Sequence, residues 1–382
     1  MMKKISLFLV LCILLSCGAL ADFSDSSVEY DPDLGQYALQ IAALCYSPSL
    51  QASMLKTGGY RQAGVYNMNR AADDDRHVAA YAVYEKTRDD GRSEVIIAIR
   101  GTGAGEWKLN MDLMPSGDYD LPYAENFALA AEDILNAQAD LLSSLKDPVF
   151  LVTGHSRGAA VANILGARLT DEYGEDNVFA YTFATPRTVR GEYEVYDNIF
   201  NIINPADLVT YLPFPQWGFE RYGTDITLPV DDPALEAAAE AAYAQRADQT
   251  GPFPASEGAV ETVQQIIDAM ASLSPDVASG YTVTHALAHP GEAQEGEPGL
   301  TSSEFMLALV DGNGSSLTGM NGSDSEQAAA VENDFTPLFA ALSSSPDTAR
   351  ITMMHMPATY GAWMEAMTAG PQDDQAKEES DK

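Results

Sequence analysis

One stretch of this chain has the residue types and spacing for nucleophilic acyl transfer, and it centres on a serine. Residues 149–153 form an apolar run, residues 154–158 read Gly-His-Ser-Arg-Gly, and an alanine-rich segment follows. A strand, a sharp turn and a helix are the context in which a Gly-x-Ser-x-Gly turn presents a reactive hydroxyl. Such a turn strains its backbone, and Gly154 and Gly158 leave room for closely packed chain. We therefore predict that Ser156 is a nucleophile.

A serine nucleophile needs a base to accept its proton, and that base needs a carboxylate to fix its tautomer. After a turn of this kind, the acid and then the histidine come later in the chain. Asp207 has the expected place for the acid, in the turn at 204–207 directly after an apolar strand at 199–203. Ligand-facing residues lie at that end of parallel strands. The alternative role for Asp207 is a helix or turn cap.

Five histidines are candidates for the base, and their positions separate them. The expected order excludes His77, because it precedes the serine. His155 adjoins the serine, where a histidine packs or bonds locally. His285 and His289 lie in a segment that we interpret as an insertion. His355 opens a loop that leads into a terminal helix, which is the setting expected for the base, so we predict this role for His355. A core histidine among methionine and tryptophan is the alternative.

Two backbone donors are also needed, to stabilise the negative charge that develops on the substrate oxygen. The amide of Arg157, directly after the nucleophile, is the first. The second comes from the loop after an earlier strand, and Thr102 has this position after the strand predicted at 94–100. Taken alone, the Arg-Gly-Thr sequence at 100–102 indicates an ordinary turn at a strand end rather than an oxyanion loop.

Strands and helices alternate along the chain, which favours an α/β fold with a mostly parallel central sheet covered by helices. After Pro229 the segment 231–345 reads as a helical insertion, with helices at 231–247 and 259–273, within one hydrolase domain that covers 22–370. Residues 371–382 are polar and acidic, and we expect a disordered tail. The other predicted elements are strands at 79–85, 149–153 and 177–185, the first forming a hairpin with 94–100, and helices at 34–45 and 127–145.

Residues 1–21 have the features of a signal peptide. Two lysines precede an apolar run at 5–16, and an Ala-Leu-Ala cleavage sequence ends at residue 21. The run is shorter than the ~20 residues that a spanning helix needs, so we expect no transmembrane helix in the mature protein. We expect secretion; the alternative is a lipoprotein cut before Cys17 and anchored through it, because the preceding residues resemble a lipobox.

Charge and composition exclude several classes of partner. The formal net charge is −35, from 56 acidic and 21 basic residues, so nucleic acid and strongly anionic membranes would be repelled. Residues 311–322 begin like a calcium loop, but lack its sixth-position glycine and twelfth-position glutamate. The chain has no His/Cys cluster and no nucleotide-binding glycine motif, so we expect no metal and no cofactor. Neutral ester substrates remain compatible with the charge.

These segments together resemble the class 3 (fungal-type) lipases. The resemblance lies in the elbow at 153–158 and in four further segments: Arg100-Gly101-Thr102 with Glu106, Trp107, Asn110 and Asp112; Phe183 to Pro186; Asn204 to Pro213; and His355 to Tyr360. It implies an α/β-hydrolase fold that cleaves carboxylic esters, with acylglycerols or related lipids as substrates met at a lipid–water interface. It carries Ser156, Asp207 and His355 over as a catalytic triad and Thr102 and Arg157 as oxyanion donors. Trp107 and Asp112 would brace the oxyanion loop.

The chain departs from the compact fungal enzymes in one respect. Asp207 and His355 are 148 residues apart, a longer gap that contains the predicted insertion. The insertion could form a lid or part of an acyl pocket, or change the substrate. The same triad also serves phospholipases, thioesterases and acyltransferases, and a non-catalytic surface-binding protein on a hydrolase scaffold is the alternative from another class.

Overall fold

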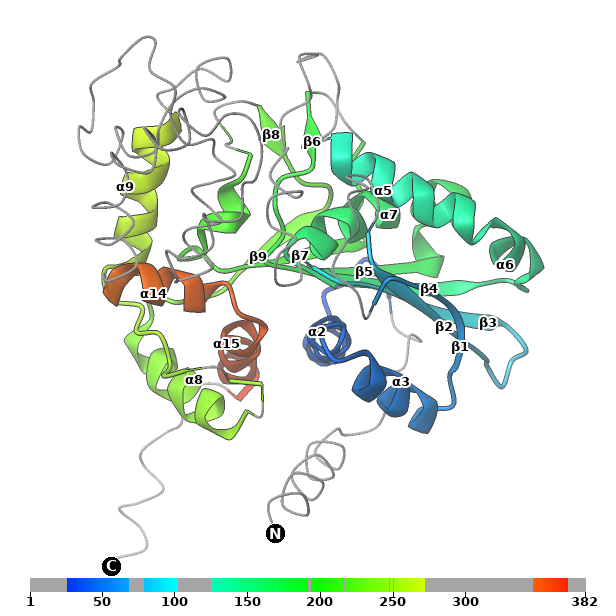
Figure 1. The fold of residues 1–382 in the computed structure, drawn as a ribbon, viewed down its shortest axis with the longest axis horizontal. Helices are drawn as coiled ribbons and strands as arrows, with labels where there is room; N and C mark the ends of the chain where they lie inside the picture. The colour runs from blue at the N-terminus through cyan, green and yellow to red at the C-terminus, as the bar shows by residue number, and fades with distance from the viewer. Residues whose placement is uncertain are drawn as a thin grey trace, which may run out of the picture.

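A seven-stranded sheet forms the centre of the fold (Figure 1). The computed structural model describes residues 26–68, 79–101, 125–191, 194–213, 215, 218–246, 248–249, 251–271 and 346–369. The strand order is β1-β2-β3-β4-β5-β7-β9. The strands are β1 (Arg61–Tyr66), β2 (Tyr81–Thr87), β3 (Ser93–Ile99), β4 (Val149–His155), β5 (Val178–Phe183), β7 (Ile199–Ile203) and β9 (Thr224–Thr227). A separate antiparallel pair joins β6 (Val189–Arg190) to β8 (Phe219–Glu220).

The sheet is mostly parallel, as the alternation of elements predicts. Strands β3, β4, β5, β7 and β9 run parallel, whereas β1 and β2 are antiparallel to their neighbours. The predicted hairpin is confirmed, since β2 pairs with β3 from Tyr81 opposite Ile99 to Thr87 opposite Ser93. Every residue of β4, β5 and β7 is buried. A parallel sheet covered on both faces requires such apolar strands.

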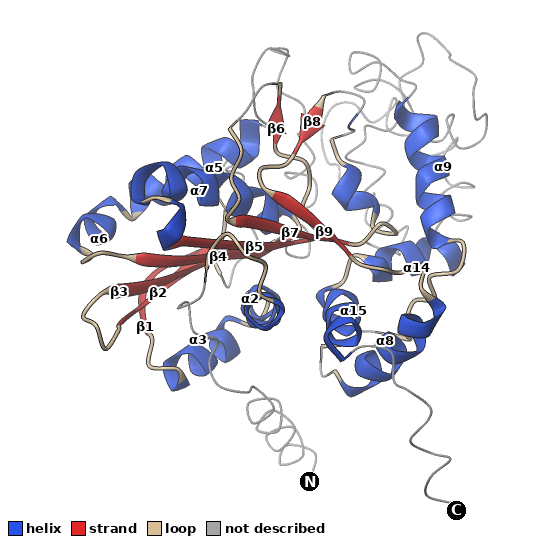
Figure 2. Cartoon of the chain, turned by 180° about the vertical axis from the view of Figure 1, so that it is seen from behind, coloured by secondary structure: helices blue, strands red, loops and turns tan. Residues whose placement is uncertain are grey.

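Helices cover both faces of the sheet (Figures 1 and 2). On one face lie α5 (Glu125–Ala137), α6 (Ala139–Ser144) and α7 (Arg157–Tyr173). The other face carries α2 (Pro32–Leu44) and α3 (Pro48–Thr57), with α15 (Pro357–Ala369) beside α2 and α8 (Pro233–Gln245) against α15. The other helices among the described residues are α9 (Ala259–Ala271), α14 (Pro346–Met354) and the short η1 (Glu175–Asn177) and η2 (Leu208–Tyr211).

The prediction of one long helix at 127–145 is wrong, because the chain breaks at Gln138 into α5 and α6. Gln138 has φ −105° and ψ 8°, outside the helical range, and its side-chain amide donates to the Tyr81 hydroxyl at 2.8 Å. Its backbone N–H still bonds to the carbonyl of Ile134 at 3.0 Å. The apolar periodicity therefore continues across a break that it cannot reveal.

The beginning of the predicted insertion packs against the terminal helix. Arg246, which follows α8, pairs with Glu365 of α15 at 2.7 Å. Its guanidinium crosses α15 at Gly361, where a Cβ atom would lie 2.2 Å from Nη1. The predicted signal peptide, residues 272–345 and the acidic residues 371–382 fall outside the described residues. None of the helices that are described is both long and apolar enough to cross a membrane.

Candidate active site

Ser156 occupies the turn between β4 and α7, as the sequence predicts. Its backbone has φ 59° and ψ −131°, and such a conformation in a residue other than glycine costs roughly 1–3 kcal/mol. The surrounding chain holds it there: the Ser156 N–H donates to the carbonyl of Phe183 at 2.9 Å, and the Ser156 carbonyl accepts from Ala159 at 2.8 Å. The serine is thus fixed at the carboxyl end of a central strand.

The two glycines that flank the serine allow this close packing. A Cβ on Gly158 would lie 2.3 Å from the carbonyl oxygen of Ile99 on β3, and a Cβ on Gly154 would lie 2.3 Å from the carbonyl oxygen of Gly158. No side chain fits at these distances. The elbow helix can therefore approach the neighbouring strand only if both positions lack a side chain.

Asp207 lies at the same edge of the sheet, four residues after β7. It begins η2, and its Oδ1 accepts from the Val209 N–H at 3.0 Å. Its Oδ2 accepts from the Nδ1 of His355 and from the hydroxyl of Tyr360, each at 2.8 Å. The capping role and the pairing with histidine, which are alternatives in the sequence, are both present. Three donors hold the carboxylate in one orientation.

His355 lies at the corner between α14 and α15, so a helix precedes it as well as following it. Its side chain is buried. Because Nδ1–H donates to Asp207, the neutral imidazole carries its free lone pair on Nε2. Nε2 has no hydrogen-bond partner among the described residues, Ser156 included. In substrate-free enzymes the bond from the nucleophile to the base is often long and tightens only when substrate binds.

His155 connects His355, the predicted base, to the elbow. It is the last residue of β4, and its ring lies 4.8 Å from that of His355, centroid to centroid. Its Nε2 bonds to the backbone carbonyl of His355 at 2.8 Å. The sequence predicts that this histidine packs or bonds locally; it does pack beside the elbow, but its hydrogen-bond partner is 200 residues away.

The structure describes one of the two predicted oxyanion donors, Arg157. Arg157 is the first residue of α7, and the N–H groups of a first helical turn have no acceptor within the helix. Gly101 lies against the elbow, since a Cβ there would be 2.6 Å from the carbonyl oxygen of His155 and 3.3 Å from the Cβ of Ser156. The loop that begins here carries Thr102, which lies outside the described residues, as do Trp107 and Asp112.

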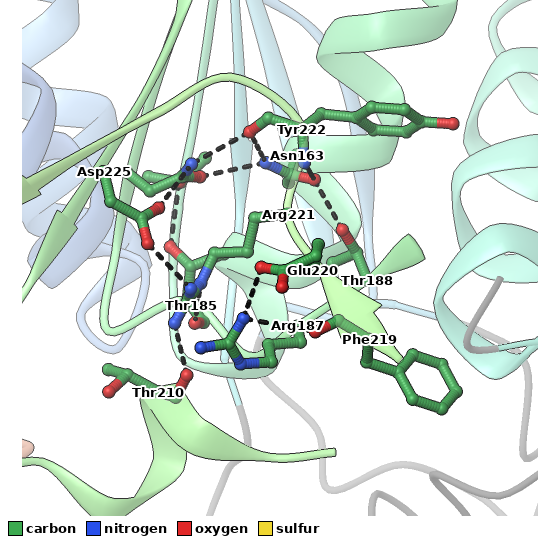
Figure 3. A network of polar contacts seen from close by, with 12 residues as sticks. Asn163, Thr185, Arg187, Thr188, Thr210, Phe219, Glu220, Arg221, Tyr222 and Asp225 are labelled. Carbon is green, nitrogen blue, oxygen red and sulfur yellow. Dashed lines mark hydrogen bonds and ion pairs between the residues drawn. The ribbon is translucent and has the colours of Figure 1, made fainter. Parts of the chain in front are cut away.

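A buried polar network joins the elbow helix to the strands beside it (Figure 3). The amide of Asn163, on α7, donates to Asn201 Oδ1 and to the Tyr222 carbonyl, each at 2.9 Å. The Asn163 Oδ1 accepts from the Thr188 hydroxyl at 2.7 Å. Asn201 is on β7, the strand that leads to Asp207. The network therefore fixes the nucleophile's helix relative to the acid's strand.

Arg221 extends this network to the acid's own loop (Figure 3). Its guanidinium donates to the carbonyls of Thr185, at 2.8 Å, and Thr210, and pairs with Asp225 at 2.9 Å. Burial lowers the pKa of this guanidinium. The Thr210 hydroxyl in turn donates to the Asp207 carbonyl at 2.8 Å. A buried cation thus links the turn after β5 to the segment that carries Asp207.

The sequence motifs assign no role to three residues that support the site, Tyr360, Asn204 and Arg221. Tyr360 lies in the resembling stretch 355–360, and its position five residues after the histidine is the signal that could have singled it out. Asn204 opens the resembling segment 204–213, whereas Arg221 lies outside every resembling segment and gives no such signal. Within the described ranges no group of His, Cys, Asp and Glu could hold a metal, and the absence of a cofactor stays a prediction.

The sheet topology and the strand–turn–helix around Ser156 define an α/β-hydrolase fold. Residues 96–217, about a third of the chain, match the model of the lipase (class 3) family. The match confirms the resemblance that the motifs carry, and with it the predicted enzyme class, a carboxylic ester hydrolase of the lipase type.

Solved lipase structures resemble the chain over about half its length. The Rhizomucor miehei triacylglyceride lipase is 18% identical with a TM-score of 0.41, covering 51% of this chain and 79% of its own. The lipase of Rhizopus microsporus var. chinensis is 17% identical with a TM-score of 0.40, covering 50% and 73%. A lipase of Yarrowia lipolytica is 14% identical with a TM-score of 0.40, covering 51% and 79%.

Proposed function

We propose that this protein is a secreted serine hydrolase that cleaves lipid esters through Ser156, His355 and Asp207. The observation that carries the proposal is the buried 2.8 Å bond from His355 Nδ1 to Asp207 Oδ2, which leaves His355 Nε2 as the proton-accepting atom. The serine and the aspartate follow parallel strands, so they lie at the same edge of the sheet, where such folds bind ligands. His155 links the base to the elbow.

The reaction is a two-step acyl transfer. His355 Nε2 accepts the Ser156 proton as Oγ attacks the ester carbonyl, and the Asp207 carboxylate stabilises the imidazolium that forms. The amides of Arg157 and Thr102 stabilise the negatively charged oxygen, and loss of one such donor costs about 100- to 1,000-fold in rate. The imidazolium then protonates the leaving alcohol. Water, deprotonated by the same histidine, releases the acid and restores the serine.

Acylglycerols at a lipid–water interface are the substrates we propose. The match to the class 3 lipases over residues 96–217 supports a lipid ester. The net charge of −35 supports a neutral rather than an anionic lipid surface, because like charges repel. Export rests on the signal-peptide features of residues 1–21.

Ester hydrolysis by the purified mature protein tests this proposal. Ser156→Ala is expected to abolish hydrolysis of p-nitrophenyl esters and of a triacylglycerol emulsion, with an unchanged far-UV circular dichroism spectrum. Ser143→Ala, at an exposed serine of α6, is the matched control and should retain full activity. Activity retained in Ser156→Ala would refute the assignment, and a preference for phospholipid over triacylglycerol would refute the proposed substrate class.

A further inference from the structure

His155 uses both of its ring nitrogens, and the partners fix its tautomer. Its Nε2 lies 2.8 Å from the backbone carbonyl oxygen of His355, which can only accept. Nε2 therefore carries the proton. Its Nδ1 lies 3.2 Å from the hydroxyl of Tyr46, at the corner after α2, so the phenol is the donor in that bond. The imidazole thus connects the N-terminal helical corner to the base.

The carbonyl that His155 holds belongs to the corner between two helices. The N–H of Met356 bonds to Met353 at 3.2 Å, and the N–H of Thr359 bonds to Met356 at 3.0 Å. These bonds close the end of α14 and the start of α15 without using the carbonyl of His355. A buried carbonyl without a donor costs about 1–3 kcal/mol. The bond from His155 removes this cost and fixes the peptide from which the base projects.

The loop that carries Asp207 also contacts the corner between α14 and α15, at the residue before His355. Asn204 donates through its side-chain amide to the carbonyl of Met354 at 3.1 Å, the residue directly before His355. Two successive carbonyls are therefore held from two sides, one by the last residue of β4 and one by the loop after β7. The backbone of the base is positioned relative to both of the groups with which its side chain must interact.

The charge state of His155 suits this role. Burial, and to a smaller extent the neighbouring His355, lower the pKa of His155 to about 3, so the ring is neutral in the pH range of ester hydrolysis. The titratable groups that face it are His355, Asp207, Tyr46 and Tyr360. A positive charge on this ring would repel the imidazolium that forms on the base. A neutral donor holds the base without that repulsion.

We propose that His155 is a positioning residue for the base, acting through its hydrogen bond to the backbone carbonyl of His355. The inference rests on the proposed function, since it assigns a second histidine to the same site. In this proposal the hydrogen bond that residue 155 donates, and not only the space that its side chain fills, is needed to position the base. Any residue there that cannot donate should leave the base misplaced in a folded protein.

Two substitutions at this position separate the donor from the packing. In His155→Gln the side-chain amide can occupy the place of Nε2 and still donate, whereas His155→Met fills similar space without a donor. We expect His155→Met to lower kcat about 10- to 100-fold with little change in KM, as a small misplacement of a catalytic group does. His155→Gln should recover most of that loss. Ile134→Ala, at a buried site on α5, controls for lost stability and should keep kcat.

The comparison is made with a soluble p-nitrophenyl ester, at a temperature where all variants are folded. Equal kcat in His155→Met and the wild-type protein would overturn the inference, as would a His155→Gln variant that is as slow as His155→Met. A ¹⁵N-histidine NMR titration tests the same hydrogen bond independently of catalysis, because it reports the protonation state and tautomer of the ring. His155 should remain neutral with the proton on Nε2 between pH 5 and 9. Titration of His155 near pH 6.5 would also overturn it. Failure of the wild-type protein to hydrolyse any ester would count against the proposed function instead.

Discussion

Replacing His155 by glutamine should remove a defined contribution to the pH dependence of stability. The folded-state pKa of His155 is about 3, against an ordinary value of 6.5 in the unfolded chain. Between these values the unfolded chain binds one more proton than the folded protein, so the free energy of unfolding falls as the pH falls below 6.5. The slope is about 1.4 kcal/mol per pH unit. Between pH 8 and pH 5 the loss from this group is therefore about 2 kcal/mol.

Urea unfolding of the two proteins at pH 8 and pH 5 measures this contribution. Glutamine does not titrate, and the groups that face the ring are the same in both proteins. The difference in free energy of unfolding between variant and wild type should therefore shift by about 2 kcal/mol in favour of His155→Gln at pH 5. Ile134→Ala should show the same deficit at both pH values. A difference for His155→Gln that does not change with pH would refute the assignment of a neutral buried imidazole.

Two further substitutions test the support of the acid. Tyr360→Phe removes a donor to Asp207 and leaves the Asn204 N–H, which bonds to the phenol at 3.1 Å, without an acceptor. We expect the free energy of unfolding in urea to fall by about 1–3 kcal/mol and kcat to fall as well. Unchanged values of both would contradict this role. Arg221→Met removes the guanidinium donor of the Thr210 carbonyl and should cost about 1–3 kcal/mol by thermal unfolding. Arg221→Lys should not restore the loss, because an ammonium lacks the planar fork; full recovery would count against the network.

The elbow and the acid could be predicted from the sequence because their signals are local. The apolar strand, the two glycines and the small residues of α7 lie within about 20 positions of Ser156. Asp207 follows its strand by four residues. Short range is enough for such features, since a turn between a strand and a helix is set by the residues that form it.

The residues that hold the site together could not be predicted in this way, because their partners are distant in the chain. Tyr360 and Asp207 are 153 residues apart, and His155 meets the carbonyl of His355 across 200 residues. Gln138, at the break between α5 and α6, bonds to Tyr81, 57 residues away. Tertiary contacts of this kind leave no periodicity, and only the order of serine, acid and histidine indicated that these segments meet.

Covalent labelling tests the central claim, that Ser156 is activated by His355. A fluorophosphonate probe reacts with an activated serine, and peptide mass spectrometry identifies the labelled residue. We predict a single adduct, on Ser156, in the wild-type protein, and labelling at least 100-fold slower in His355→Ala, because a positioned base contributes about 100- to 10,000-fold. A folded wild-type protein that carries no adduct on Ser156, or a His355→Ala variant labelled as fast as the wild type, would contradict the account.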